Sequence, residues 1–444
     1  MLDNEFHISK EARATLVSIV CPGFEEHKSE EDTKRSLVEL GELMRTLGVP
    51  TVGEVIQNRK SIDPATIIGS GKLDEIAQMA RDNDSGLLVF DCELSASQIR
   101  NIRRISGLSV VDRCHVILEI FSQHAYTKEA KIQIEIARLG YILPRLSGFW
   151  SHLGRQRGGV GVLGGEGEKQ IELDRRIIRE RIEFYKRQIE DVAKGRVVRS
   201  KKRKNQAVTA ALVGYTNAGK SSLMNRLCRV DILEEDKLFA TLDSTYRMLN
   251  PDTKPPMILV DTVGFISNLP NTLIDGFKTT LESALEADLL IIVCDISDPH
   301  YEKHLSVTKN VLEELGVREK DSLIVFTKKD LLSDPHRDKV IKRLHPNSFV
   351  ISTHDKEDVS AVRTHVINYF LSKQDDHDLF IPYDDGQAIS RIQSKTNILA
   401  TQNHETGIFY RIKTPNFIFD TLGLADYVLS PEDPYYKDTK KDHL

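Results

Sequence analysis

Short apolar runs alternate with helical patterns along the first part of the chain. The runs cover residues 14–21, 51–56 and 86–90, and we expect them to form strands. Between them, apolar residues return every three or four positions over residues 31–47 and 72–79, which is typical of helices with one buried face. This alternation predicts a small α/β domain, to which we assign residues 1–128.

The pattern changes to two long helical segments over residues 129–200. The second segment has apolar residues mostly at alternating steps of four and three, which is coiled-coil spacing. We interpret this region as an antiparallel helical hairpin, and the alternative is one long surface helix packed on a neighbouring domain. The apolar positions are Ile171, Ile178, Ile182, Tyr185, Ile189 and Val192.

A glycine-rich stretch at residues 158–168 separates the two helical segments. Six of its eleven residues are glycine, a composition that disfavours a packed element. One interpretation is a flexible linker. The other is a loop whose bare backbone approaches a ligand or RNA closely, and the sequence leaves both open.

Strand and helix patterns alternate again over residues 201–372. Near-continuous apolar runs cover residues 207–213, 257–260, 289–294, 323–326 and 349–351. Strands of this kind are buried on both faces, as in a doubly wound parallel sheet. Strand patterns at residues 380–383 and 407–412 predict a further small α/β domain over residues 373–444. The fold class is therefore multidomain α/β.

Composition adds limits to this picture. A chain of 444 residues is too long to form a single hydrophobic core of ordinary size. Its net charge of −5 argues against a protein that binds nucleic acid through a generally basic surface. It lacks an apolar run of about 18 residues, so we expect no membrane-spanning segment, and the acidic N-terminus predicts a cytoplasmic protein. The cysteines are scattered and odd in number, which indicates reduced thiols: Cys21, Cys92, Cys114, Cys228 and Cys294.

One motif, G-x-x-x-x-G-K-[ST], carries the strongest chemical signal. It follows the run at residues 207–213 and precedes a helical pattern at 222–228, the setting that a phosphate-binding loop requires. Its backbone N–H groups can surround phosphates, Lys220 can neutralise β and γ charges during catalysis, and Ser221 can ligate Mg²⁺. The predicted nucleotide-binding residues are Gly214, Tyr215, Thr216, Asn217, Ala218, Gly219, Lys220 and Ser221.

A look-alike run, Gly69-Ser70-Gly71-Lys72, occurs upstream. It has Thr66 where the first glycine belongs, and Leu73 follows its lysine in place of a hydroxyl residue. We therefore interpret it as a turn leading into a helix.

Two further segments are predicted to bind phosphate and metal. Asp261 can hold Mg²⁺ through water, the Gly264 amide can reach the γ-phosphate, and Thr241 offers a second hydroxyl to the metal. We assign catalytic roles to Lys220, Thr241 and Gly264. Loss of the γ-phosphate would release these segments and change the conformation. The segments comprise Phe239, Ala240, Thr241, Leu242 and Asp243, and Asp261, Thr262, Val263 and Gly264.

Guanine selectivity is predicted from residues that follow two later strands. The Asp330 carboxylate can accept from N1–H and the exocyclic amine of guanine, whereas adenine lacks this donor pair. Lys328 would lay its stem along the base. Backbone amides of the second segment could reach the guanine carbonyl oxygen. The residues are Thr327, Lys328, Lys329 and Asp330, and Ser352, Thr353 and His354.

Phe265 follows Gly264, where many small GTPases place a glutamine that orients the attacking water. A phenyl ring cannot orient water. We therefore predict slow intrinsic hydrolysis, with the water positioned by another group or by a partner.

Taken in this order, the motifs resemble the translation-factor-like class of GTPases, and nearly the whole chain resembles one family in it, HflX. Outside the P-loop GTPase domain the resemblance rests on residues 54–57, 64–72, 91–101, 129–135, 152–161 and 167–176. It implies a GTPase that binds the large ribosomal subunit and its rRNA. It also implies that the protein splits or rescues stalled ribosomes and hydrolyses GTP faster when bound to them. We expect the protein to be a monomer.

The sequence departs from the family pattern at three places, which is compatible with a divergent paralogue that has an altered ribosomal task. Thr327 replaces the usual asparagine and removes about one hydrogen bond, about 1 kcal/mol of nucleotide affinity. The linker reads differently at residues 162–167, and His124 stands where arginine is common.

A local cluster of cations precedes the GTPase domain, with seven cations within residues 194–204. With the resemblance, phosphate neutralisation on RNA is the favoured interpretation, and a solvated linker is the alternative. If the cluster binds RNA, the ribosomal function is favoured. The alternative function is a nucleotide-gated switch that recruits a protein without contacting RNA. The predicted RNA-binding residues are Arg155, Arg157, Arg196, Arg199, Lys201, Lys202, Arg203 and Lys204.

Overall fold

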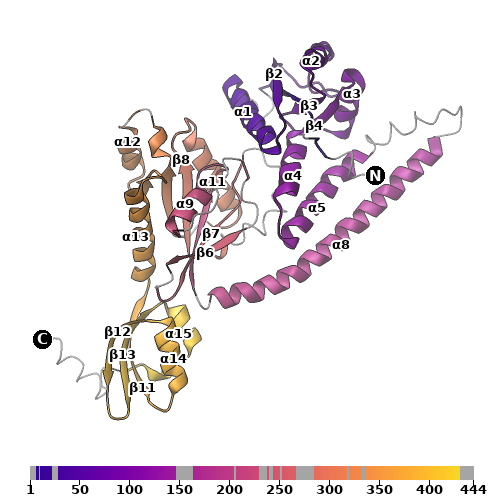
Figure 1. The fold of residues 1–444 in the computed structure, drawn as a ribbon. Helices are drawn as coiled ribbons and strands as arrows, with labels where there is room; N and C mark the ends of the chain where they lie inside the picture. Colours follow the sequence, from indigo (N-terminus) through magenta and orange to yellow (C-terminus); the bar gives the residue numbers. More distant parts are fainter. Residues whose placement is uncertain are drawn as a thin grey trace. The chain divides into compact units, whose positions relative to one another are not determined.

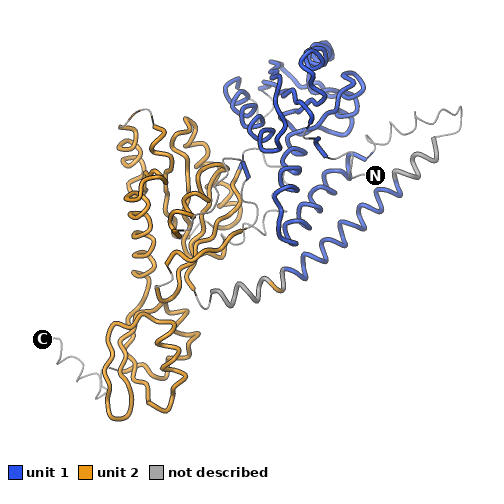
Figure 2. The backbone as a smooth tube through the Cα atoms, viewed as in Figure 1, with its two compact units in different colours: residues 1–192, 235–243, 266–280 blue, residues 193–234, 244–265, 281–444 orange. Residues whose placement is uncertain are grey.

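The computed structural model divides the chain into two compact units (Figures 1 and 2). Unit 1 comprises residues 1–192, 235–243 and 266–280, and unit 2 the remaining residues. Among the described helices, none combines the length and apolar character needed to cross a membrane. The structure describes residues 7–9, 11–22, 29–146, 164–204, 207–229, 238–239, 244–250, 253–266, 285–317, 320–332, 334 and 336–430.

Unit 1 contains a parallel four-stranded sheet in the order β2-β1-β3-β4 (Figure 1). Val17 of β1 lies opposite Val55 of β2 and Phe90 of β3, so the central strand is apolar on both sides. The strands and their helices are β1 (Ala14–Val20), α1 (Glu30–Leu47), β2 (Thr51–Asn58), α2 (Ser70–Asp82), β3 (Leu87–Phe90), α3 (Ala96–Ser106) and β4 (Ser109–Asp112). The predicted α/β alternation is confirmed, and β4 and α3 are additions to it.

Local signals explain where these helices begin. The Ser95 side chain accepts from the Gln98 amide while the Gln98 side chain accepts from the Ser95 amide, a capping box that starts α3. Helix α2 begins at Ser70 after Gly69, so the look-alike glycine run is a helix-leading turn, as predicted.

Buried ion pairs attach the next helices to the sheet edge. Arg113, at the start of α4 (Arg113–His124), pairs with Asp91 at 2.8 Å and with Glu39. Asp112 is fully buried; it accepts from Tyr141 of α5 (Lys128–Ile142) at 2.8 Å, and lies 3.6 Å from Arg145. Burial raises the pKa of Asp112 and the Arg145 charge opposes that rise. These contacts fix α4, α5 and the following 3₁₀ turn η2 (Leu143–Arg145) to the end of β4.

The second helical segment is one long helix, α8 (Gly164–Lys204), visible as such in Figure 1. Ile178 is 2% exposed, whereas Leu173 and Ile177 are 40% and 49% exposed, so the predicted apolar stripe marks the covered face. Two details of the prediction were wrong. Residues 164–168 are helical despite their glycines, because a helix end tolerates glycine and a long helix propagates cooperatively. The helix also continues past residue 200 to Lys204, so the backbone of the cation cluster is helical.

Unit 2 holds a six-stranded sheet in the order β10-β9-β8-β5-β7-β6. Five strands are parallel, as predicted, but β6 pairs antiparallel with β7 at the edge. The prediction missed β6 because its Tyr246 and Met248 are exposed, so it lacks a continuous apolar run. The strands are β5 (Val208–Gly214), β6 (Thr245–Asn250), β7 (Met257–Asp261), β8 (Leu289–Asp295), β9 (Ser322–Thr327) and β10 (Ser348–Val350).

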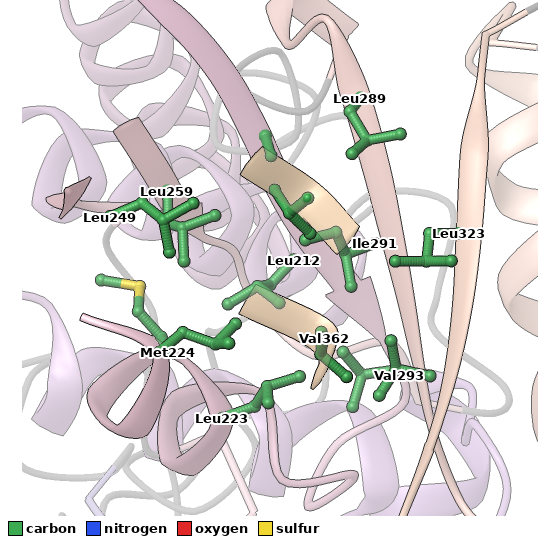
Figure 3. Close-up of a cluster of buried hydrophobic side chains, with 14 of the residues drawn as sticks. Leu212, Leu223, Met224, Leu249, Leu259, Leu289, Ile291, Val293, Leu323 and Val362 are labelled. Carbon is green, nitrogen blue, oxygen red and sulfur yellow. The ribbon is translucent and has the colours of Figure 1, made fainter. Parts of the chain in front are cut away.

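Helices cover both faces of this sheet. Leu212 and Ile291 point toward α9 (Lys220–Leu227) and α13 (Lys356–Ser372) in one buried cluster (Figure 3). On the opposite face, Phe326 meets Tyr301 of α11 (Tyr301–Glu314) with ring centroids 5.9 Å apart. Helix α12 (Arg337–Leu344) and the 3₁₀ turn η3 (Lys329–Leu331) connect β9 to β10. This packing places the carboxyl ends of the parallel strands at one edge.

The C-terminal part of unit 2 is a small antiparallel sheet in the order β11-β13-β12, as the strand patterns predicted. Tyr410 and Ile412 lie in its buried core with Phe419. Its elements are β11 (Asp375–Pro382), α14 (Gly386–Lys395), β12 (Asn397–Asn403), β13 (Gly407–Thr414), α15 (Asn416–Leu422) and η4 (Ala425–Tyr427).

Candidate nucleotide-binding site

The glycine motif lies between β5 and α9, in the strand-to-helix setting that was predicted. A Cβ on Gly214 would stand 2.1 Å from the Val293 carbonyl oxygen, so only glycine fits beside β8. Gly219 has φ of 83° at the start of α9, a left-handed conformation that glycine adopts without strain. These two positions give the loop its curl.

Lys220 lies inside this curl with its side chain buried. Its Nζ donates to the carbonyl oxygens of Tyr215 at 2.7 Å and Gly214 at 3.2 Å. Burial lowers the pKa of this amine to about 8, and the nearby Asp261 opposes the shift. Phosphate oxygens would supply the negative charge that this buried amine lacks, so the lysine is placed to bind them.

A hydroxyl and a carboxylate converge next to the lysine. Ser221 Oγ donates to Asp261 Oδ2 at 2.7 Å, and Asp261, at the end of β7, is 2% exposed. Oxygen atoms of this kind are the ligands that Mg²⁺ prefers. The pair fits the predicted arrangement, in which Ser221 ligates the ion directly and Asp261 binds it through water.

The segment after β7 is hydrogen-bonded to the phosphate loop. Phe265 N donates to Gly214 O at 3.0 Å, and Thr216 N donates to Phe265 O at 2.6 Å. A Cβ on Gly264 would stand 2.7 Å from Thr216 Cα and 2.9 Å from Lys220 Nζ, so the glycine permits this close approach. The Gly264 backbone is therefore beside the amine expected to bind the γ-phosphate.

The side chains of three neighbouring residues, Thr262, Val263 and Phe265, are buried in the protein interior. The Thr262 hydroxyl donates to Leu212 O at 2.7 Å, Val263 is buried, and the Phe265 side chain is 3% exposed. The Phe265 ring is thus a core group, and it has no polar atom for a water molecule.

The guanine motif is tied to the phosphate loop by Thr327. Its hydroxyl lies 2.7 Å from Ala218 O, to which it donates, and 3.3 Å from Cys294 O. Lys328 Nζ pairs with Asp295 Oδ2 at 2.8 Å, and Asp330 is exposed at the mouth of the site. Thr327 thus makes the loop-bracing contact with the single proton that a hydroxyl can donate.

The residues after β10 form a tight turn beside this motif. Ser352 N donates to Asp358 Oδ2 at 2.9 Å, and His354 N donates to Ser352 Oγ at 3.2 Å. Lys329 N donates to Ile351 O at 3.1 Å, which joins the two guanine segments. Two of the amides predicted to reach the guanine oxygen are therefore engaged within the protein. The contact from Thr353 stays a prediction.

Phe239 belongs to a hydrophobic contact within unit 1. Its ring meets Phe121 of α4 edge-on, with centroids 4.6 Å apart, and both side chains are buried. The motif did not reveal this packing. Ala240, Thr241, Leu242 and Asp243 lie outside the described residues, so the predicted nucleotide and metal contacts of residues 239–243 stay predictions.

The predicted RNA-binding residues fall in two groups. Arg155 and Arg157 lie outside the described residues. Arg196, Arg199, Lys201, Lys202, Arg203 and Lys204 lie on α8, where the backbone alone is described.

Two site neighbours were absent from the prediction. Asp295 ends β8 and pairs with Lys328, and a carboxylate at the end of a buried strand was the signal for it. His304 of α11 stacks on the Tyr215 ring with centroids 4.0 Å apart. No sequence pattern indicates that stack, because it joins residues far apart along the chain.

Family models match three consecutive regions of the chain. A model described as GTP-binding GTPase N-terminal matches residues 34–122, and one described as GTP-binding GTPase Middle Region matches residues 124–203. A third, described as 50S ribosome-binding GTPase, matches residues 209–328 and contains the phosphate loop.

Relatives match over almost the whole length. GTPase HflX of Gluconacetobacter diazotrophicus is 40% identical over 436 residues, covering 90% of this chain and 94% of its own. The chain belongs to the HflX family of GTPases. GTPase HflX of Lacrimispora saccharolytica is 41% identical over 401 residues, covering 88% of this chain and 92% of its own. As an HflX family member the chain is a GTP hydrolase, and the resemblance inferred from its motifs is confirmed.

A solved structure also aligns with this HflX family chain. It is a GTP-binding protein from the hyperthermophilic archaeon Sulfolobus solfataricus in complex with GDP, 24% identical, with a TM-score of 0.44. The alignment covers 80% of this chain and 99% of that one.

Proposed function

We propose that this protein is a GTP-controlled factor that binds the large ribosomal subunit and splits or rescues stalled ribosomes. The observation that carries the proposal is the match of its nucleotide-binding domain to a family model described as 50S ribosome-binding GTPase. The buried Phe265 ring supports it, because a phenyl ring in the position of the water-orienting glutamine leaves fast hydrolysis dependent on a partner. We propose that the protein acts as a cytoplasmic monomer.

Magnesium belongs to the same proposal. Ser221 and Thr241 would ligate the ion, and Asp261 would hold it through water. The ion would neutralise charge on the β- and γ-phosphates. The convergence of Ser221 and Asp261 supports the first and last of these assignments.

A groove in unit 1 has the chemistry to hold RNA. It lies between α5 and α8, has a volume of about 620 Å³, and places three cations, Lys128, Lys131 and Arg181, around two tyrosines. Tyr126 is 78% exposed, and the Arg181 guanidinium lies 5.9 Å from the centre of the Tyr185 ring. Exposed aromatic rings among cations can stack on unpaired bases while the cations contact phosphates. Glu135 is the single acidic residue in the lining.

The cation cluster extends the same helix. The backbone of residues 196–204 is helical, and the sequence places six cations among them. A run of cations this dense favours a polyanion, such as the rRNA backbone, over a protein surface.

Sedimentation with purified large subunits tests this function. We expect co-sedimentation with a non-hydrolysable GTP analogue, weak co-sedimentation with GDP, and a steep fall in affinity as salt increases. Replacing Lys201, Lys202 and Arg203 by glutamine should reduce the log–log salt slope by about two to three.

The matched control replaces three exposed cations of α12, namely Lys339, Lys342 and Arg343, by glutamine. It makes the same change in net charge and should leave the salt slope intact. Absence of GTP-dependent co-sedimentation at low salt would contradict the ribosomal function and favour a switch that recruits a protein. An equal loss in both triple variants would show that net charge alone is responsible.

A further inference from the structure

One buried hydroxyl in the phosphate loop is not used by the fold. Thr216 is 7% exposed, and its Oγ1 has no hydrogen-bond partner among the residues that the structure describes. The other hydroxyls nearby are engaged: Ser221 donates to Asp261, and Thr327 donates to Ala218 O. Buried polar atoms are nearly always paired, so an unpaired one within a binding site indicates a missing ligand.

The position of Thr216 identifies which part of the nucleotide it would meet. Its Cα and Cγ2 would stand 2.7 Å and 2.9 Å from a Cβ on Gly264, and Lys220 Nζ would stand 2.9 Å from the same point. Thr216 therefore lies beside the amine and the backbone segment that bind the terminal phosphate of a nucleotide triphosphate. The α- and β-phosphates are the expected ligands of the later amides of the loop, toward Gly219.

The backbone holds Thr216 in this place. Its amide donates to Phe265 O at 2.6 Å, and Phe265 N donates to Gly214 O at 3.0 Å. These two backbone hydrogen bonds join Thr216, whose side chain bears the hydroxyl, to the segment that contains Phe265. Thr216 thus stands beside the residue that occupies the usual position of the water-orienting glutamine. Its hydroxyl can both donate and accept a hydrogen bond.

We propose that the Thr216 hydroxyl is a catalytic residue of GTP hydrolysis, which donates to a γ-phosphate oxygen and accepts from the attacking water. In this step the water oxygen forms a bond to the γ-phosphorus, and the bond from that phosphorus to the β–γ bridging oxygen breaks. The bridging oxygen leaves with GDP, and the proton of the water passes to the released phosphate. Thr216 neither gains nor loses a proton, so its contribution is orientation and charge stabilisation.

The test is single-turnover GTP hydrolysis by the full chain with magnesium, without ribosomes, combined with titration of a fluorescent GDP analogue. Thr216→Val keeps the shape and burial of the side chain but removes the hydroxyl. We expect its hydrolysis rate to fall about 10²-fold, the usual loss for one donor to a developing charge, with GDP affinity within about twofold of the wild type. Thr216→Ser restores the hydroxyl and should recover most of the rate.

A threonine outside the site serves as the matched control. Thr209 lies on β5, the strand that leads into the phosphate loop, and its hydroxyl bonds Asp288 at 3.2 Å, so Thr209→Val should hydrolyse GTP at the wild-type rate. The proposal is overturned if Thr216→Val keeps the wild-type rate, or if serine fails to restore it. It is also overturned if GDP affinity falls as far as the rate, since the hydroxyl would then support the fold of the loop. These results concern hydrolysis without ribosomes, so they are independent of the ribosomal function.

Discussion

Replacing Lys220 by alanine is expected to reduce GTP affinity by ~10²–10³-fold and to bring GTP hydrolysis below detection. The amine is buried within the phosphate loop and bonds two loop carbonyl oxygens, so its removal takes the cation away from the expected phosphate site. Hydrogen bonds to charged groups contribute about 1.5–3 kcal/mol each, and this amine would reach two phosphates. Titration of a fluorescent GTP analogue and phosphate release measure the two losses.

The chain contains its own control for this variant. Lys72 ends the look-alike glycine run in unit 1, and it pairs with Glu75 on the surface at 2.7 Å. Lys72→Ala should therefore bind and hydrolyse GTP as the wild type does. Wild-type GTP affinity in Lys220→Ala, or a matching loss in Lys72→Ala, would contradict the assignment of the phosphate loop.

Replacing Asp330 by asparagine is expected to change base preference from guanine to xanthine. The carboxylate is expected to accept from N1–H and the exocyclic amine, and losing two charge-assisted bonds of about 1.5–3 kcal/mol each would lower GTP affinity by ~10²–10⁴-fold. Xanthine carries an oxygen where guanine has the amine, so the asparagine amide can donate to that oxygen and accept from N1–H. Hydrolysis of xanthosine triphosphate should therefore exceed GTP hydrolysis in the variant.

Competition between the two nucleotides for a fluorescent GDP analogue measures this switch. Asp334 lies four residues further on and accepts from the His336 amide at 2.9 Å, so Asp334→Asn tests a nearby carboxylate without a base contact. It should keep the guanine preference. Equal GTP affinity in wild type and Asp330→Asn would show that another residue selects the base.

The parts of the fold that were predictable are those in which one local pattern decides the structure. The buried strands β5, β8 and β9 are apolar on both faces, and their runs give nearly the observed bounds. The phosphate loop is similarly local, because glycine positions such as Gly214 are set by close backbone contacts within a short segment. The spacing of residues along the chain was therefore enough to predict the phosphate loop.

The parts that could not be predicted depend on distant contacts. Edge strand β6 forms only because β7 offers its free edge, and its own exposed residues resemble a loop. Burial of Phe239 depends on Phe121, and pairing of Lys328 depends on Asp295. Composition also misled for residues 164–168, where glycine content suggested a break within what is helix α8.

Thr327 shows how structure changes the meaning of a substitution. The sequence alone shows only that a threonine, which can make fewer hydrogen bonds, stands where the family usually has an asparagine. In the structure its hydroxyl bonds Ala218 O at 2.7 Å and so braces the phosphate loop against β9. Thr327 therefore makes a bracing contact that the sequence did not indicate, and guanine selection by Asp330 stays a prediction.

Fast hydrolysis is expected to depend on a partner, since an intact phosphate loop is combined with a buried Phe265 that cannot orient water. The most direct test is steady-state GTP turnover by the purified chain as large ribosomal subunits are titrated in. We predict slow turnover alone and a saturable rise, by at least about tenfold, as subunits are added. An unchanged rate at saturating subunits, or fast turnover by the isolated chain, would contradict this account.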